Sequence, residues 1–323
     1  MKKNRGLFYI NILLMIAIIA LLSFGIANEY IPVYDFDEIK SYIIEKYEEK
    51  FDNHGFYADM EQLDGVAVLV DEPKNDVVNT GEAYEFPEEF YPYRAMLSED
   101  GKKIYNQVYE NAMLINESFA LVSSVPAEEF ENVMCAVYND HPELFWLETS
   151  YSYGYKENGD VVSVDLVFNM KKDEIKAAKV KFNSAAMAVI SETRFIEDSL
   201  EKEKYVHDYI INNVVYDADS KLNQSAYSAL VNGSSVCAGY ARAFQYIMIE
   251  IGIPCYYCTG YANGGNHAWN LVMVGSELLN VDVSWDDYDT ENISESIRYK
   301  YFNLKDIEIE ETHIRTGLSE FIK

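Results

Sequence analysis

Apolar residues recur with helical periodicity through the middle of the chain. One stripe in 99–116 predicts an amphipathic helix, because residues three or four apart share a helix face. The stripe consists of Ile104, Val108, Ala112 and Ile115. Pro126 suits the first position of a second helix that runs to about Tyr138. Two longer helices are predicted at 173–193 and 196–213.

Three segments in this part have the apolar and β-branched character of strands. They are 66–70, 145–155 and 161–170. Asn158 and Gly159 separate the last two, and this pair supplies the positive φ angles that a tight hairpin turn needs. We therefore expect a hairpin between the helices.

The last third of the chain has a different order of elements. A strongly helical run at 238–251 ends at Gly252. Three strand-like runs follow, at 255–261, 267–274 and 278–285. One helix followed by an antiparallel sheet predicts an α+β fold for this part.

These patterns divide the chain into four regions. Residues 1–27 form an apolar N-terminal segment, and 28–97 form an acidic, partly extended region. Residues 98–195 form a domain of helices around a hairpin, and 196–323 form a C-terminal domain. We expect a smaller α/β region to precede an α+β core.

The segment Leu7–Ala27 carries no charged residue and follows basic residues at positions 2, 3 and 5. At about 1.5 Å per residue, such a helix crosses a hydrocarbon core of about 30 Å. The basic start favours a cytoplasmic N-terminus, with the rest of the chain outside. We expect a retained single-pass anchor in the cell membrane. The alternative is secretion after cleavage near Ala27, since Gly25 and Ala27 are small.

The formal net charge of −28 restricts the partners of the chain. Asp and Glu number 54 against 26 Lys and Arg, so phosphate is repelled and general nucleic-acid binding is excluded. Hydrophobic residues make up 49% of the 323 residues, which excludes wholesale disorder. Four cysteines are too few for a disulfide scaffold.

Cys237 lies where a loop rich in glycine and serine turns into the predicted helix 238–251. A helix N-terminus offers unpaired N–H groups and a partial positive charge, and both favour thiolate over thiol. The same N–H groups can stabilise the oxyanion that forms when sulfur attacks a carbonyl. Cys237 is therefore a candidate nucleophile.

His267 begins a predicted strand directly after the loop 263–266. If Gly275 and Ser276 form the turn to the next strand, His267 faces Ser284, and Asp282 is its diagonal neighbour on the same face. Diagonal neighbours lie within about 8 Å, so imidazole and carboxylate can touch. The carboxylate would orient the imidazole, which would accept the thiol proton.

Three blocks around these residues resemble the motifs of the transglutaminase-like superfamily. They are Cys237-Ala238-Gly239-Tyr240-Ala241, His267-Ala268-Trp269-Asn270 and Asp282-Val283-Ser284-Trp285-Asp286-Asp287, in the order Cys, His, Asp. Tyr301-Phe302-Asn303-Leu304 followed by His313 is similar to the tail of bacterial cell-surface members. The likeness is closest over 226–313.

The resemblance implies a papain-like core in which the helix bearing Cys237 packs on the antiparallel sheet. Cys237 would be the nucleophile, His267 the base and Asp282 the orienter. The substrates would be amides of proteins or peptides, including cell-wall or surface proteins, attacked through a thioester without a cofactor. Peptidase, deamidase and crosslinking activities all fit, and hydrolysis is favoured by analogy with bacterial relatives. Candidates for substrate or oxyanion contacts are Gln224, Tyr227, Ala238, Tyr240 and Trp269.

Other signals are weaker. Cys255 and Cys258 have the spacing of a redox pair, but residues three apart on a strand point to opposite faces. The five histidines lack the spacing of zinc ligands, so no metal site is predicted. The acidic run 286–291 fits either a calcium loop or a solvated loop.

Two functions of different classes therefore remain open. The first is a membrane-anchored, outward-facing thiol enzyme. The second is a transglutaminase-like module with an idle thiol, which binds peptides or cell wall at the cell surface.

Overall fold

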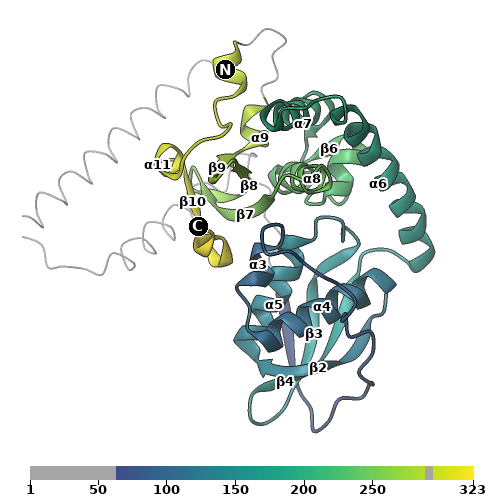
Figure 1. Ribbon diagram of the computed structural model, residues 1–323. Helices are drawn as coiled ribbons and strands as arrows, with labels where there is room; N and C mark the ends of the chain where they lie inside the picture. The colour runs from purple at the N-terminus through teal and green to yellow at the C-terminus, as the bar shows by residue number, and fades with distance from the viewer. Residues whose placement is uncertain (1–62, 288–293) are drawn as a thin grey trace, which may run out of the picture. The chain divides into compact units, whose positions relative to one another are not determined.

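The computed structural model describes residues 63–287 and 294–323, which belong to one compact unit, Gly55–Lys323. Two four-stranded sheets and their helices make up this unit, as the expected α+β class requires (Figure 1). The segment 7–27 lies outside the described residues, so its membrane anchor stays a prediction. Within the described residues, no helix is long and apolar enough to cross a bilayer.

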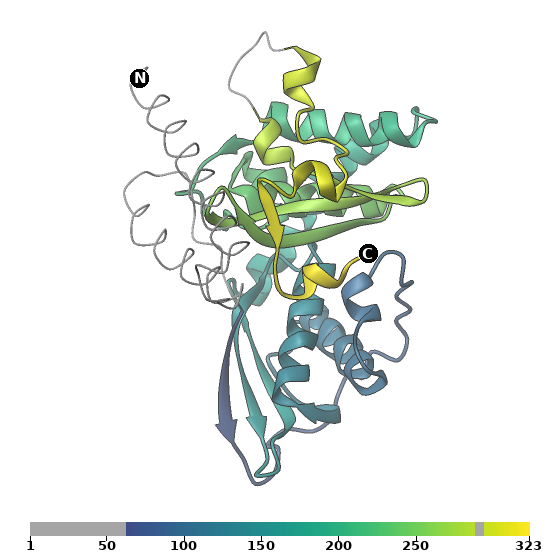
Figure 2. The ribbon, with the colours of Figure 1, turned by 90° about the vertical axis from the view of Figure 1, so that its left-hand side faces the viewer.

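The first sheet has the strand order β1-β3-β4-β2. Its strands are β1 (Asp64–Leu69), β2 (Ser118–Pro126), β3 (Leu147–Tyr155) and β4 (Asp160–Phe168). Three helices belong to this part, α3 (Pro92–Ala95), α4 (Glu99–Leu114) and α5 (Ala127–Asp140). Helices α4 and α5 lie on one face of the sheet (Figure 2). Strand β1 pairs in parallel with β3, whereas β3 and β4 form the expected antiparallel hairpin.

Two local predictions in this sheet need correction. Of the two turn residues, Gly159 has a positive φ, of 90°, and Asn158 does not. The N–H of Gly159 donates to the carbonyl of Lys156. Pro126 ends strand β2 with a ψ of 154° and precedes α5, which begins at Ala127. Strand β2 was not predicted, because its edge position and mixed polarity hide the alternation of a strand.

The second sheet has the order β10-β7-β8-β9, and helix α8 packs against β7 and β8 (Figure 1). Its strands are β7 (Cys255–Ala262), β8 (Gly265–Val274), β9 (Glu277–Val281) and β10 (His313–Arg315). The longer helices are α6 (Lys172–Thr193), α7 (Ser199–Asn213) and α8 (Cys237–Glu250). The shorter elements are β5 (Val215–Tyr216), the π-helical turn Ser228–Asn232, β6 (Ser234–Ser235), α9 (Val283–Asp286), α10 (Glu295–Arg298), α11 (Asp306–Ile309) and the 3₁₀ turn Gly317–Phe321.

The hairpin of β8 and β9 has the predicted register. Val274 pairs with Glu277 around the two-residue turn, and Asn270 pairs with Val281. The predicted third strand is too long, however, because β9 ends at Val281. Asp282 instead caps helix α9, and its side chain accepts a hydrogen bond from the N–H of Trp285. The capping bond bends the chain out of the sheet after Val281, three residues before Ser284, the expected pairing partner of His267.

Candidate active site

Cys237 is the first residue of helix α8, and only 2% of its surface is exposed. The residue before it, Val236, is extended, and no acidic residue occupies the first turn of the helix. The thiol therefore lies at the positive end of a 14-residue helix, as the sequence predicted.

Gly239 fixes the position of this helix start. A Cβ at Gly239 would overlap the hydroxyl of Ser235 and lie 2.8 Å from the carbonyl oxygen of Asn223. That carbonyl accepts hydrogen bonds from the Ser235 hydroxyl and from the N–H of Val236. The loop therefore packs directly on the first turn of α8, and only glycine leaves room for it.

His267 and Asp282 form a buried hydrogen-bonded pair. Nε2 of His267 lies 2.7 Å from Oδ2 of Asp282, and the two residues are 4% and 1% exposed. The other carboxylate oxygen, Oδ1, accepts hydrogen bonds from the Ser284 hydroxyl at 2.8 Å and from the N–H of Trp285 at 3.1 Å. The carboxylate is thus held in one orientation, with Oδ2 directed at the imidazole.

The charges of these groups support one another. Burial alone would lower the pKa of His267, but the Asp282 carboxylate and the Cys237 sulfur, by charge and by hydrogen bonding, raise it well above its usual value. Burial alone would raise the pKa of Asp282, and His267 together with His313 holds it far below its usual range. Since Nε2 of His267 is engaged with Asp282, Nδ1 is the ring nitrogen left for the thiol.

Tyr216 is a further residue at the thiol, and the sequence did not indicate it. Strand β5 pairs in parallel with β6, and this pairing sets Tyr216 opposite Ser235, two residues before Cys237. Burial raises the pKa of Tyr216, and its interactions include the charge, backbone N–H and side chain of Cys237. A two-residue strand has no pattern that would reveal it in a sequence. Tyr216 is 37% exposed, whereas the thiol beneath it is almost closed off.

Two of the predicted contact residues, Gln224 and Tyr227, have defined surroundings, and their contact with substrate or oxyanion stays a prediction. Gln224, which is 8% exposed, lines a small cavity with Arg242, and Cys237, His267 and Asp282 are not in its lining. Tyr227 packs its ring against Phe145 at a centroid distance of 4.7 Å. Gln224 lies between Asn223 and Ser225, whose carbonyl oxygens would be 2.8 and 2.9 Å from a Cβ at Gly239 in the first turn of α8.

The other three contact candidates have defined places. The hydroxyl of Tyr240 is hydrogen-bonded to the carbonyl of Val214 at 2.9 Å, which favours a packing role. Trp269 stacks on His267, with ring centroids 6.1 Å apart, but its indole N–H donates to Asn280. Ala238 follows Cys237 in the first turn of α8, so its backbone N–H is one of the free donors of the helix start.

A second histidine, His313, reaches the same carboxylate. Its Nε2 lies 3.0 Å from Oδ2 of Asp282. The ligand atoms of His267, Asp282 and His313 lie within 4.8 Å of one another, which a metal ion could use. Both Nε2 atoms, however, are at hydrogen-bond distance from the same oxygen, and His267 also interacts with Cys237. These contacts fit an imidazole–carboxylate array.

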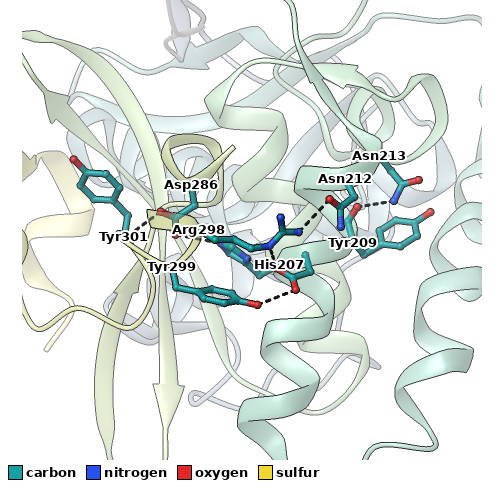
Figure 3. Close-up of polar contacts among 9 residues, drawn as sticks. His207, Tyr209, Asn212, Asn213, Asp286, Arg298, Tyr299 and Tyr301 are labelled. Carbon is teal, nitrogen blue, oxygen red and sulfur yellow. Dashed lines mark hydrogen bonds and ion pairs between the residues drawn. The ribbon is translucent and has the colours of Figure 1, made fainter. Parts of the chain in front are cut away.

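A second buried histidine, His207, joins helix α7 to the end of helix α9 (Figure 3). His207 on α7 contacts Asp286 at the end of α9 through Nε2, at 3.2 Å. Oδ1 of Asp286 accepts the N–H of Tyr301, while Tyr299 and Arg298 donate to Asp208 (Figure 3). The carboxylate of Asp286 is therefore bonded to His207 and Tyr301 and is not part of a solvated loop. Residues 288–293 lie outside the described residues, so the calcium alternative stays untested.

The other three cysteines have a different environment. All four described thiols are free, including Cys255 and Cys258. Burial raises the pKa of Cys135 to about 11 and that of Cys258 to about 12, and it raises the pKa of Cys255 as well. No histidine contributes to the pKa shifts of these three thiols, whereas His267 interacts with Cys237.

Comparisons with known proteins agree with the motifs. The family model of the transglutaminase-like superfamily matches residues 188–289. The comparison with curated proteins gave no match. Similar solved structures include a candidate cysteine protease from Cytophaga hutchinsonii, with 22% identity over 39% of this chain and 52% of that chain, at a TM-score of 0.29.

Two further structures are similar to the chain. One is the periplasmic domain of TgpA from Pseudomonas aeruginosa, with 14% identity over 47% of this chain and 59% of that chain, at a TM-score of 0.29. The other is a TGase, with 13% identity over 67% and 62% and a TM-score of 0.34. The chain thus spans 52–62% of the length of these three solved chains. The segment 188–289, which the model of the transglutaminase-like superfamily matches, contains Cys237, His267 and Asp282.

Proposed function

We propose that the protein is a thiol enzyme that attacks amide carbonyls of proteins or peptides, with Cys237 as nucleophile, His267 as general base and Asp282 as orienter. The observation that carries this proposal is the place of the His267 ring. Its Nε2 is fixed by a buried carboxylate at 2.7 Å, and the ring interacts with the sulfur of Cys237 at a helix start. A nucleophile, a base and an oriented base partner are the parts that covalent acyl transfer needs.

The reaction follows from these positions. The thiol proton moves to Nδ1 of His267, and the sulfur attacks the carbonyl carbon to give a tetrahedral oxyanion. The imidazolium returns the proton to the nitrogen as the C–N bond breaks, which releases an amine or ammonia and leaves a thioester on Cys237. Water or a lysine amine then attacks the thioester, His267 takes the proton of the incoming group, and the thiol is regenerated. No cofactor is required for these steps.

The oxyanion needs hydrogen-bond donors near the sulfur. The backbone N–H groups at the start of α8, those of Cys237 and Ala238, are in place for this role. The Tyr216 hydroxyl interacts with both the backbone N–H and the side chain of Cys237. It is therefore a candidate side-chain donor to the oxyanion.

The cellular setting is part of the same proposal. The segment 7–27 would anchor the protein in the cell membrane, with the enzyme outside. Protein or peptide substrates at the cell surface or in the cell wall fit this place, and nucleic acid does not fit a net charge of −28. Hydrolysis is the expected main outcome.

One incubation tests the reaction. The protein is mixed with a glutamine peptide, with and without a primary amine, and the products are read by mass spectrometry. A shift of about one dalton identifies deamidation, the added amine mass identifies transfer, and shorter fragments identify proteolysis. The variant Cys237→Ala should abolish the signal, and Cys135→Ala should leave it unchanged. Activity that survives in Cys237→Ala would remove Cys237 from the mechanism.

One observation favours a second function, that of a binding module with an idle thiol. The exposed fraction of Cys237 is only 2%, and Tyr216 lies against it. A module of this kind would hold peptide without modifying it. Binding of the glutamine peptide with no change of mass, together with a thiol that stays inert to iodoacetamide, would support this second function.

A further inference from the structure

Strand β10 brings His313 to the sheet that carries His267. His267 on β8 pairs with Gly260 on β7, and His313 on β10 pairs with Ala262, two residues further along β7. Residues paired across strands, and residues two apart on one strand, share a face of a sheet. His267, Gly260, Ala262 and His313 therefore lie on one face, and only small residues separate the two imidazoles.

Gly260 makes this approach possible. A Cβ at Gly260 would overlap the carbonyl oxygen of Ile314 and lie 2.9 Å from the ring of Trp269. The ring centroids of His267 and His313 are 5.5 Å apart across this position. Glycine thus lets β10 dock against β7 closely enough for both rings to reach Asp282.

The surroundings of His313 hold its ring in one orientation. Its side chain is fully buried, and its ring lies 5.0 Å from Trp269, 4.5 Å from Trp285 and 5.8 Å from Tyr301. Nδ1 lies 2.8 Å from the hydroxyl of Thr312. The Thr312 hydroxyl also lies 3.0 Å from the Ile309 carbonyl, so it can accept from Nδ1 or donate to it, and with Nε2–H donated to Asp282 both ring nitrogens are satisfied.

Oδ2 of Asp282 consequently receives two imidazole N–H groups, one from His267 at 2.7 Å and one from His313 at 3.0 Å. A carboxylate with one partner on this oxygen could turn or take up a proton in so dry a site. We propose that His313 is a positioning residue for the reaction: by donating Nε2–H to Oδ2, it keeps Asp282 ionised and oriented, and so fixes the tautomer of His267. This inference rests on the proposed roles of Cys237, His267 and Asp282.

The test compares two substitutions of His313. Leucine keeps the bulk and removes the N–H, whereas glutamine keeps a donor at the place of Nε2. The readout is the rate of iodoacetamide alkylation of Cys237 between pH 5 and 9, located by mass spectrometry. His313→Leu should lower the rate at neutral pH by roughly tenfold and displace the pH profile, because loss of a partner behind a functional group typically has that effect. His313→Gln should stay within about threefold of the wild type.

The ionisable groups packed around the His313 ring are His267, Asp282 and Tyr301, so the pH profile reports on this array. His141→Leu is the matched control, because His141 is also a buried imidazole and contacts Tyr105 and Glu143 instead. It should lower the melting temperature and leave the alkylation profile unchanged.

A measurement on the wild-type protein keeps the inference testable if both variants fail to fold. Histidine ¹⁵N NMR at pH 7 should show protons on Nε2 of both His267 and His313. A bare Nε2 on His313, or a His313→Leu profile equal to that of the wild type, would overturn the inference while Cys237 remained reactive. If wild-type Cys237 is itself inert, the proposed function fails first, so the two failures are distinguishable.

Discussion

Replacing Asp282 by asparagine tests the orienting carboxylate with almost no change of shape. Oδ1 can keep its bonds from Ser284 and Trp285, but Oδ2 becomes an NH₂ group. That donor then faces the N–H groups of His267 at 2.7 Å and His313 at 3.0 Å. Two buried donor–donor conflicts are the direct consequence.

The size of the effect follows from these contacts. Each buried N–H left without an acceptor costs roughly 1–3 kcal/mol, so two of them should lower the free energy of unfolding by about 2–6 kcal/mol. His267 can relieve its conflict by moving its proton to Nδ1, the nitrogen left for Cys237. It can then no longer accept the thiol proton. In a serine-protease triad this change of tautomer lowers kcat by roughly 10⁴-fold, and we expect alkylation of Cys237 to slow by at least about 10²-fold.

The assay combines urea unfolding with the rate of iodoacetamide labelling at pH 6, at which the wild-type pair is held in the reactive state. Asp286→Asn is the matched control, because Asp286 ends the same short helix and contacts His207 and Tyr301. It should lose stability but keep a reactive thiol. A labelling rate in Asp282→Asn within twofold of the wild type would refute the reasoning.

Three further predictions concern stability and location. Burial raises the pKa of Glu203 to about 7, so the folded state holds a proton that the unfolded state releases, and stability falls as pH rises from about 4.5 to 7. Glu203→Gln should remove this fall, which is worth roughly 3 kcal/mol in the free energy of unfolding. A melting temperature that falls with pH as steeply as in the wild type would contradict the prediction. Gly239→Ala should lower the free energy of unfolding in urea by about 1–3 kcal/mol, because the added methyl overlaps Ser235; equal stability would show that the loop yields freely. Deleting residues 1–27 should move the protein from the membrane to the soluble fraction. Unchanged fractionation would refute the prediction that this segment is a membrane anchor.

The second sheet could be predicted well because its signals are local. Gly275 and Ser276 set the register of β8 and β9, and that register is observed. The end of β9 could not be predicted in the same way. Asp282 and the residues after it fit a strand by composition. The side chain of Asp282 instead accepts the N–H of Trp285, and this capping bond competes with continued pairing of the strand.

Two contacts in the site that the sequence did not predict join distant segments of the chain. His313 reaches Asp282 from a three-residue strand 31 positions later, and Tyr216 reaches Cys237 from a two-residue strand. Elements this short have no periodicity. Gln224 and Tyr227 were proposed as substrate or oxyanion contacts, and that role stays a prediction.

The parallel pairing of β1 with β3 is a similar case, because the paired residues are 86 positions apart, as in Asp64 and Ser150. A strand was predicted at 66–70, and the structure contains it as β1. Helices α4 and α5 and strand β2 lie between the two strands in the sequence, and no local pattern encodes a pairing over that separation.

The most direct test of the proposed active site is competition among the four free cysteines for limiting iodoacetamide at pH 6, read by peptide mass spectrometry. Cys237 is as buried as Cys255 and Cys258, so exposure alone would not select it. The proposal predicts that Cys237 is labelled first and that His267→Ala abolishes this preference. Equal labelling of the four thiols, or a preference that survives in His267→Ala, would contradict the catalytic pairing of Cys237 and His267.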